Sequence, residues 1–162
     1  MSEPIEITPD IDIDELLSDV YFDTVIEEHI LKAYEQACIE TITKARNQPS
    51  PPGNLRVMPH QPKYIDDTGN LRKSLGYAVF HNGEVWHYKA DNATAKATIA
   101  KAASTMEGIA IGAVLVAGEK YATYVEKKGY NVLTQQYIEF QNVLKKYLAQ
   151  AEIEIQRALN GD

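Results

Sequence analysis

The sequence predicts an α+β fold in which an antiparallel sheet packs against two long helices. Two segments, about 19–46 and about 133–159, repeat apolar residues at steps of three and four, which is the period of an amphipathic helix. Between them, an Asn-Gly pair separates two β-rich runs and predicts a hairpin over 76–89. A short apolar run bounded by glycines predicts a further strand over 109–117.

Length and composition are those of one globular domain. The chain has 162 residues, of which 44% are apolar and 24% charged, as in ordinary soluble domains. We expect an acidic N-terminal arm over 1–18 and a single domain over 19–162 that contains a long loop over 47–67. Cys38 is the one cysteine, so it has no disulfide partner within the chain, and its helical setting predicts a buried, inert thiol.

Charge and hydropathy argue against two classes of partner. The net charge is −7, and Lys and Arg occur in short pairs, so we expect no specific nucleic-acid binding. No stretch approaches the roughly 20 apolar residues that span a bilayer, so we expect no membrane partner. The N-terminus lacks the basic and apolar regions of a signal peptide, which favours an intracellular protein.

The acidic arm alternates isoleucine with other residues, at Ile5, Ile7, Ile11 and Ile13. Alternation with period two indicates an extended strand, and Pro9 restricts such a strand to a sheet edge. Two interpretations stay open. The arm is either a disordered tail or a strand that orders by adding to a sheet edge, the edge of a neighbouring copy included.

The first long helix ends before Pro49, where a proline-rich connection begins. This loop, over 47–67, has no periodicity of its own, and such long loops are typically functional or mobile. Thr68 is placed to cap a short helix that follows the loop. Leu71 and Leu75 lie four residues apart and are expected to face inward together.

The hairpin register follows by counting outward from a turn at Asn82-Gly83. One face is expected to pack on the helices with a large apolar surface, formed by Tyr77, Val79, Trp86 and Tyr88. The other face is expected to carry Ala78, Phe80, Val85 and His87. Because this second face is not polar, as a solvent-facing sheet should be, we expect it to meet another layer or another chain.

The second half of the chain contains one ambiguous segment and two predicted helices. Segment 90–107 is rich in Ala, Thr and Lys and is either a weakly amphipathic helix or a mobile loop. A short helix is expected over 119–128, with Gly129 at its C-terminal end. The apolar stripe of the last helix is expected to be a core face.

A search for catalytic or ligand-binding patterns found none. The four histidines lack zinc-site spacing, the acidic arm lacks the glycine and closing glutamate of a calcium loop, and no nucleotide-binding or nucleophile motif occurs. We therefore expect no enzyme, no catalytic residues, no cofactor and no metal. An enzyme with a dispersed site, using Glu84, His87 or Tyr88, is the least favoured alternative.

Two segments, taken in order, resemble one family of phage proteins. Residues 68–75, Thr-Gly-Asn-Leu-Arg-Lys-Ser-Leu, resemble the T-G-x-L-R-x-S start of small tail-component proteins of long-tailed bacteriophages. Residues 121–126, Tyr-Ala-Thr-Tyr-Val-Glu, resemble that family's Y-A-x-Y-V-E segment. The order, the spacing and the preceding long helix fit the family over roughly residues 20–135.

The resemblance implies a structural protein of a phage or prophage virion, without catalysis. Members act as tail-completion, head–tail joining or tail-terminator-like proteins at the neck or the tail end. By resemblance, the chain is expected to form a ring with copies of itself, six in number. The ring is expected to contact other neck or tail proteins after assembly in the cytoplasm of a bacterial host.

The candidate oligomer interface combines the arm with the second hairpin face. Its residues are Ile11 and Ile13 on the arm and Phe80 and Val85 on the hairpin. The alternative function, from another class, is a cytoplasmic adaptor or regulator that binds a protein partner through the long C-terminal helix, as a monomer or dimer.

Overall fold

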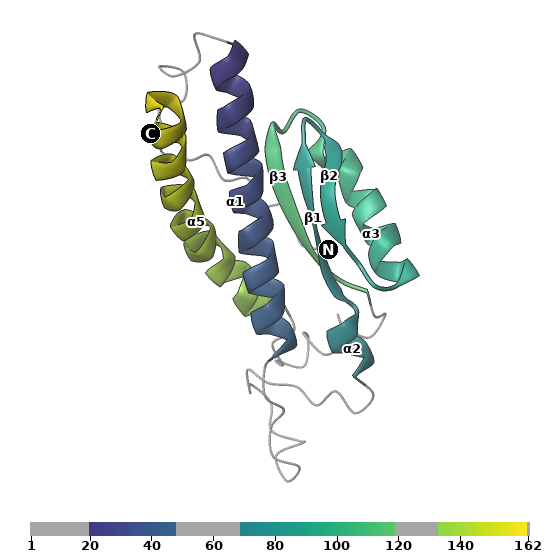
Figure 1. Ribbon diagram of the computed structural model, residues 1–162. Coiled ribbons are helices and arrows are strands. Elements are labelled where there is room, and N and C mark those ends of the chain that lie inside the picture. Colours follow the sequence, from purple (N-terminus) through teal and green to yellow (C-terminus); the bar gives the residue numbers. More distant parts are fainter. Residues whose placement is uncertain (1–19, 48–68, 119–132, 162) are drawn as a thin grey trace.

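The computed structural model describes residues 20–47, 69–118 and 133–161 (Figure 1). Its elements are, in chain order, α1 (Val20–Arg46), α2 (Asn70–Lys73), β1 (Leu75–His81), β2 (Glu84–Lys89), α3 (Ala93–Ala103), the 3-10 turn η3 (Ser104–Met106), β3 (Ile111–Ala117) and α5 (Thr134–Asn160). The predicted α+β fold is confirmed, because two long helices accompany an antiparallel three-stranded sheet.

Several predictions fall where the chain is not described. The acidic arm over 1–18, the loop over 47–67 apart from Asn47, the capping role of Thr68 and the short helix over 119–128 lie outside the described residues.

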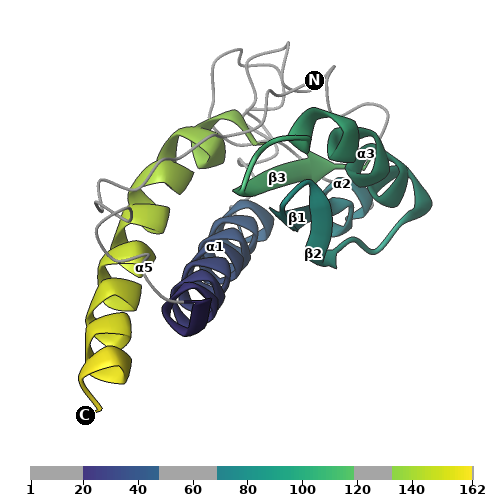
Figure 2. The ribbon, with the colours of Figure 1, turned by 90° about the horizontal axis from the view of Figure 1, so that it is seen from above.

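The sheet has the order β2-β1-β3, with antiparallel neighbours, so β1 is its central strand. Helix α1 covers one face and α3 the other, and both helices lie over β1 and β3 (Figures 1 and 2). As a result β1 is buried from Leu75 to Phe80, whereas every residue of β2 is exposed. Within the described part of the chain, β2 therefore lies outside both helix layers.

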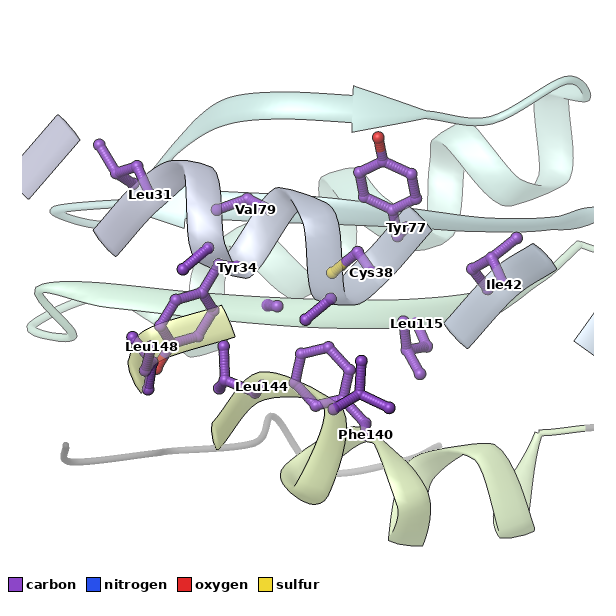
Figure 3. Packing of buried hydrophobic residues seen from close by; sticks show 14 of the residues in the cluster. Leu31, Tyr34, Cys38, Ile42, Tyr77, Val79, Leu115, Phe140, Leu144 and Leu148 are labelled. Carbon is purple, nitrogen blue, oxygen red and sulfur yellow. The ribbon is translucent and has the colours of Figure 1, made fainter. Parts of the chain in front are cut away.

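The larger core forms where α1 meets the sheet on one side and α5 on the other (Figure 2). Figure 3 shows its members converging from three elements, with Tyr34 and Cys38 on α1, Val79 and Leu115 on the sheet, and Phe140 and Leu144 on α5. The apolar stripe of α5 is thus a core face directed chiefly at α1. The arrangement makes α1 the central helix, in contact with both the sheet and α5.

A smaller core lies between the other face of the sheet and α3. Phe80 of β1 is fully buried in it, beside Ile99 of α3 and Met106 of η3. The apolar second face of the hairpin was expected to meet another layer or another chain. Along β1 it meets a layer of the same chain.

The ambiguous segment 90–107 contains the helix that forms this layer. Asn92 precedes α3 in an extended conformation, and its side-chain oxygen accepts a hydrogen bond from the Ala95 amide at 2.7 Å. This bond satisfies one of the amides that a helix start leaves unpaired. Ala95 and Ile99, one helical turn apart, then face the sheet together.

The hairpin turn is as predicted. Asn82 and Gly83 have φ angles of 51° and 82°, and a two-residue turn of this kind needs positive φ at both positions. The first two pairs also follow the prediction, with His81 opposite Glu84 and Phe80 opposite Val85.

The predicted register fails after those two pairs. A β-bulge shifts β2 by one residue, so that Val79 lies opposite His87 and Ala78 lies opposite Tyr88. The prediction that Tyr88 shares the α1 side of the sheet with Tyr77, and that His87 lies on the other side, is therefore wrong. A bulge inserts one extra residue into one strand, which counting from the turn does not reveal.

Candidate functional site

An apolar patch on β2 is the main exposed feature of the sheet. Val85, Trp86 and Tyr88, together called the edge patch here, are 41%, 39% and 49% exposed. Large apolar side chains on an uncovered edge strand are typical of surfaces that pair with another chain. The edge patch exists because both helices are centred on β1 and β3.

The four predicted interface residues lie in different surroundings or outside the described part of the chain. Val85 belongs to the edge patch, and its role in assembly stays a prediction. Phe80 is fully buried under α3, so its side chain already has its contacts within the chain and contributes no exposed surface. Ile11 and Ile13 lie outside the described residues.

The side of the hairpin that faces α1 is held by polar contacts. His87 of β2 lies 3.5 Å from a carboxylate oxygen of Glu35 and 3.3 Å from the Tyr77 hydroxyl. Closer to the turn, His81 lies 3.3 Å from a carboxylate oxygen of Glu27. Burial, together with Glu35 nearby, raises the pKa of Tyr77 to about 12, so its hydroxyl stays neutral. These contacts hold the middle of α1 alongside the hairpin, with Glu27 level with the turn end.

Residues 69–75, the described part of the first motif, have structural roles. Gly69 precedes α2 with φ 72°, a conformation that favours glycine. Leu71 is buried, and the Ser74 hydroxyl donates a hydrogen bond to the Leu71 carbonyl at 2.7 Å. The Arg72 guanidinium donates to the Arg46 carbonyl at 3.3 Å and so satisfies a carbonyl at the end of α1. The prediction that Leu71 and Leu75 are both buried is confirmed.

A shallow groove runs between α1 and α5, with a volume of about 550 Å³. Its central group is Glu40, whose carboxylate accepts hydrogen bonds from Lys146 and from the Tyr147 hydroxyl and forms an ion pair with Lys44. Donation by Lys146, then Lys44 and Tyr147, lowers the pKa of Glu40 to about 2. Lys146 and Tyr147 therefore link α5 to α1 through Glu40, whereas Lys44 pairs with Glu40 within α1.

The structure describes the residues of the dispersed-site alternative and the one cysteine. No group of three or more His, Cys, Asp and Glu among them is placed to hold a metal ion. Glu84, His87 and Tyr88 lie exposed on an edge strand rather than in a pocket. Cys38 is fully buried, as predicted, and burial raises the pKa of its thiol.

Two features of this surface were not found from the sequence. Trp86 was assigned to the helix-packing face, but the bulge and its place on an edge strand leave it exposed. The Glu40 cluster joins residues more than 100 positions apart, and no local pattern brings them together. Only the packing of α5 on α1 does so.

The chain matches no protein-family model, and comparisons with curated proteins and with solved structures returned no match. No described helix is long and apolar enough to cross a membrane.

Proposed function

We propose that this chain is a structural protein of a phage or prophage virion, acting as a tail-component, tail-completion or head–tail joining protein without catalysis. In this proposal, copies of the chain assemble as a ring at the neck or tail end and contact other neck or tail proteins. The observation that carries the proposal is the ordered pair of motifs, residues 68–75 and 121–126, with a hairpin and a strand between them.

The geometry supports this reading of the first motif. Its glycine starts a short helix, its leucine enters the core, and its arginine satisfies the end of α1. The motif thus joins α1 to the central strand. This structural role is what we expect of a motif that is shared because the fold is shared.

The edge patch supports assembly with other chains. A ring of identical subunits uses two different surfaces on each copy, because each contact joins one face to another. An exposed edge strand with Val85, Trp86 and Tyr88 is well suited to be one of them.

The adaptor alternative has less support from the fold. It was to bind a partner through the long C-terminal helix, but the apolar stripe of that helix, with Phe140, Leu144 and Leu148, is buried within the chain. Partner binding through that stripe would require α5 to leave α1 and expose both helices.

The test is electron microscopy of negatively stained particles from a parent phage or induced prophage that lacks the gene. Separate DNA-filled heads and free tails would indicate a joining role, whereas tails of uncontrolled length would indicate a role in termination. Normal, infectious virions would refute the proposal and favour the adaptor. Complementation with the wild-type gene is the control for effects on neighbouring genes.

A further inference from the structure

We propose that β2 accepts residues 5–13 of a second copy of this chain as an added antiparallel strand. Each copy then donates its N-terminal arm to the sheet of the next. The inference takes its setting from the proposed function, since a ring needs such a contact, but its argument comes from the geometry of β2 and the pattern of the arm.

The first step is that β2 has room for a strand. It is the edge strand of the described sheet, and all six of its residues are exposed. An edge strand presents unpaired N–H and C=O groups that bond readily to an incoming strand. Helices α1 and α3 are centred on β1 and β3, so among the described residues the outer edge of β2 is open to an added strand.

The second step is that the two faces of β2 differ. Val85 and Tyr88 lie on the α3 side, because they pair with Phe80 and Ala78 of β1. Lys89 lies on the α1 side, opposite Tyr77. No ion pair joins Lys89 to another described residue. The α3 side of β2 is thus apolar, whereas the α1 side is polar and carries Glu84, His87 and Lys89.

The arm has the matching pattern. Its isoleucines occupy odd positions, and the acidic residues Glu6, Asp10 and Asp12 occupy even positions. In a strand, odd and even residues point to opposite faces. In the register that directs the isoleucines toward the apolar side of Val85 and Tyr88, the acidic residues face the polar side of Glu84, His87 and Lys89.

The irregularities on the two partners are also compatible. The bulge in β2 lies between the partners of Val79 and Phe80, where the ladder is already interrupted. Pro9 divides the isoleucines of the arm into two pairs and has no N–H to donate. A proline is tolerated in a sheet at an edge or a bulge, so an outermost strand can contain it.

The length of chain before α1 favours donation to a second copy. The contacts of Glu27 with His81 and of Glu35 with His87 show that α1 runs beside β2 in the same direction. Because α1 begins at Val20, it extends about 10 Å beyond Glu27, at 1.5 Å per residue. The first residue of α1, from which the arm extends, therefore lies beyond the hairpin turn.

Return to its own β2 would need a full reversal within residues 14–19. Six residues span at most about 20 Å when fully extended. About half of that length is used in coming back along α1, and the rest must cross from the helix layer to the outer edge of the sheet. A hinge this short favours exchange between copies, because donation outward needs no reversal.

The chain carries its own probe for the test, since Trp86 in the edge patch is its one tryptophan. Full-length protein is diluted serially while tryptophan emission and sedimentation velocity are recorded. We expect oligomers with blue-shifted emission at high concentration, and monomers with red-shifted emission after dilution. Ile11→Asp together with Ile13→Asp should raise the concentration at the midpoint by at least about tenfold.

The matched control is Ile153→Asp, the same change at an exposed isoleucine of α5, which should leave the midpoint unchanged. Emission that is independent of concentration, or an arm variant that assembles as the wild type does, would overturn the proposal.

A mixing experiment identifies the occupant of β2. Tagged Ile11→Cys chains are mixed with untagged Tyr88→Cys chains and treated with a short bismaleimide; the native Cys38 is buried and does not compete. Cross-linked tagged–untagged pairs are expected. A separate chain that carries both substitutions serves as the comparison. If cross-links form only within that doubly substituted chain, the arm binds its own sheet. If only pairs of Tyr88→Cys chains form, β2 lies against β2 of the partner. Either result would overturn the proposal.

The two proposals fail separately. If the arm variant still forms rings in the phage, strand donation is wrong and the virion role stands. If the mixed chains cross-link but phage without the gene are normal, strand donation stands and the virion role is wrong.

Discussion

Phe80 and Val85 lie opposite each other across the hairpin, yet their surroundings differ completely. Phe80 is fully buried between β1 and α3, whereas Val85 is 41% exposed on the edge strand. The difference arises because α3 covers the central strand and leaves β2 uncovered. Phe80 therefore contributes to the stability of the fold, whereas Val85 is available for contact with another chain.

This contrast predicts the effects of truncation at the two positions. Phe80→Ala should lower the free energy of unfolding by about 3–5 kcal/mol, because it leaves a cavity in the smaller core. Val85→Ala should change it by about 0.5 kcal/mol, as is usual for exposed positions. Urea denaturation of dilute protein measures both. Equal losses would mean that α3 does not cover Phe80 as described.

Glu40 should make part of the stability depend on acid pH. Its pKa is lowered from 4.5 to about 2 by hydrogen bonds from Lys146, Lys44 and Tyr147. As pH falls below about 4.5, the unfolded chain binds a proton at this site before the folded chain does. The stabilisation from Glu40 is therefore complete above that pH and is lost as pH approaches 2.

Glu40→Gln tests this dependence. The variant should lose stability at neutral pH and show a shallower decline than wild type between pH 4.5 and pH 2. Urea midpoints across this range are the measurement. Glu28→Gln is the control, since that carboxylate is exposed on α1 and no described ion pair includes it. Parallel curves for Glu40→Gln and wild type would contradict the prediction.

At the scale of elements, two glycines show how closely the strands approach their neighbours. A Cβ added at Gly76 of β1 would lie 2.4 Å from the backbone oxygen of Lys89 at the end of β2. A Cβ added at Gly112 of β3 would meet the sulfur of Met106 at 3.0 Å, and that side chain can move. At the end of the hairpin away from the turn, β1 can approach β2 this closely only because residue 76 has no side chain.

Gly76→Ala should therefore destabilise the protein much more than Gly112→Ala does. The backbone oxygen cannot move without separating β1 from β2, so we expect a loss of about 2 kcal/mol or more for Gly76→Ala. Gly112→Ala should cost about 1 kcal/mol or less, because Met106 can adjust. Thermal and urea unfolding of the pair provide the comparison. A larger loss for Gly112→Ala would refute this account.

At the scale of the whole molecule, protection is distributed unevenly over the sheet. β1 has a hydrogen-bonded strand on each side and a helix on each face, whereas among the described strands β2 has a neighbour on one side only. Amides of β1 should exchange hydrogen at least about tenfold more slowly than those of β2 in dilute protein. Hydrogen exchange followed by mass spectrometry measures the ratio. Equal protection of both strands at low concentration would contradict the open edge.

The sequence by itself determined most of the elements, because their signals are local. Asn82-Gly83 specifies a two-residue turn through positive φ, and the steps of three and four near both ends of the chain specify helices over nearly the observed ranges. The burial of Cys38 also follows from its place in such a stripe. Segment 90–107 stayed ambiguous, since the Asn92 cap and the weak stripe of α3 gain their effect only when the sheet is present.

The tertiary structure alone decided which surfaces stay open. The bulge in β2 moves Tyr88 and His87 to opposite faces from those predicted by counting, and the placement of α3 buries Phe80. Long-range packing likewise joins Glu40 to Lys146 and Tyr147. A strand's alternation shows that it has two faces, but which face meets which layer depends on distant segments.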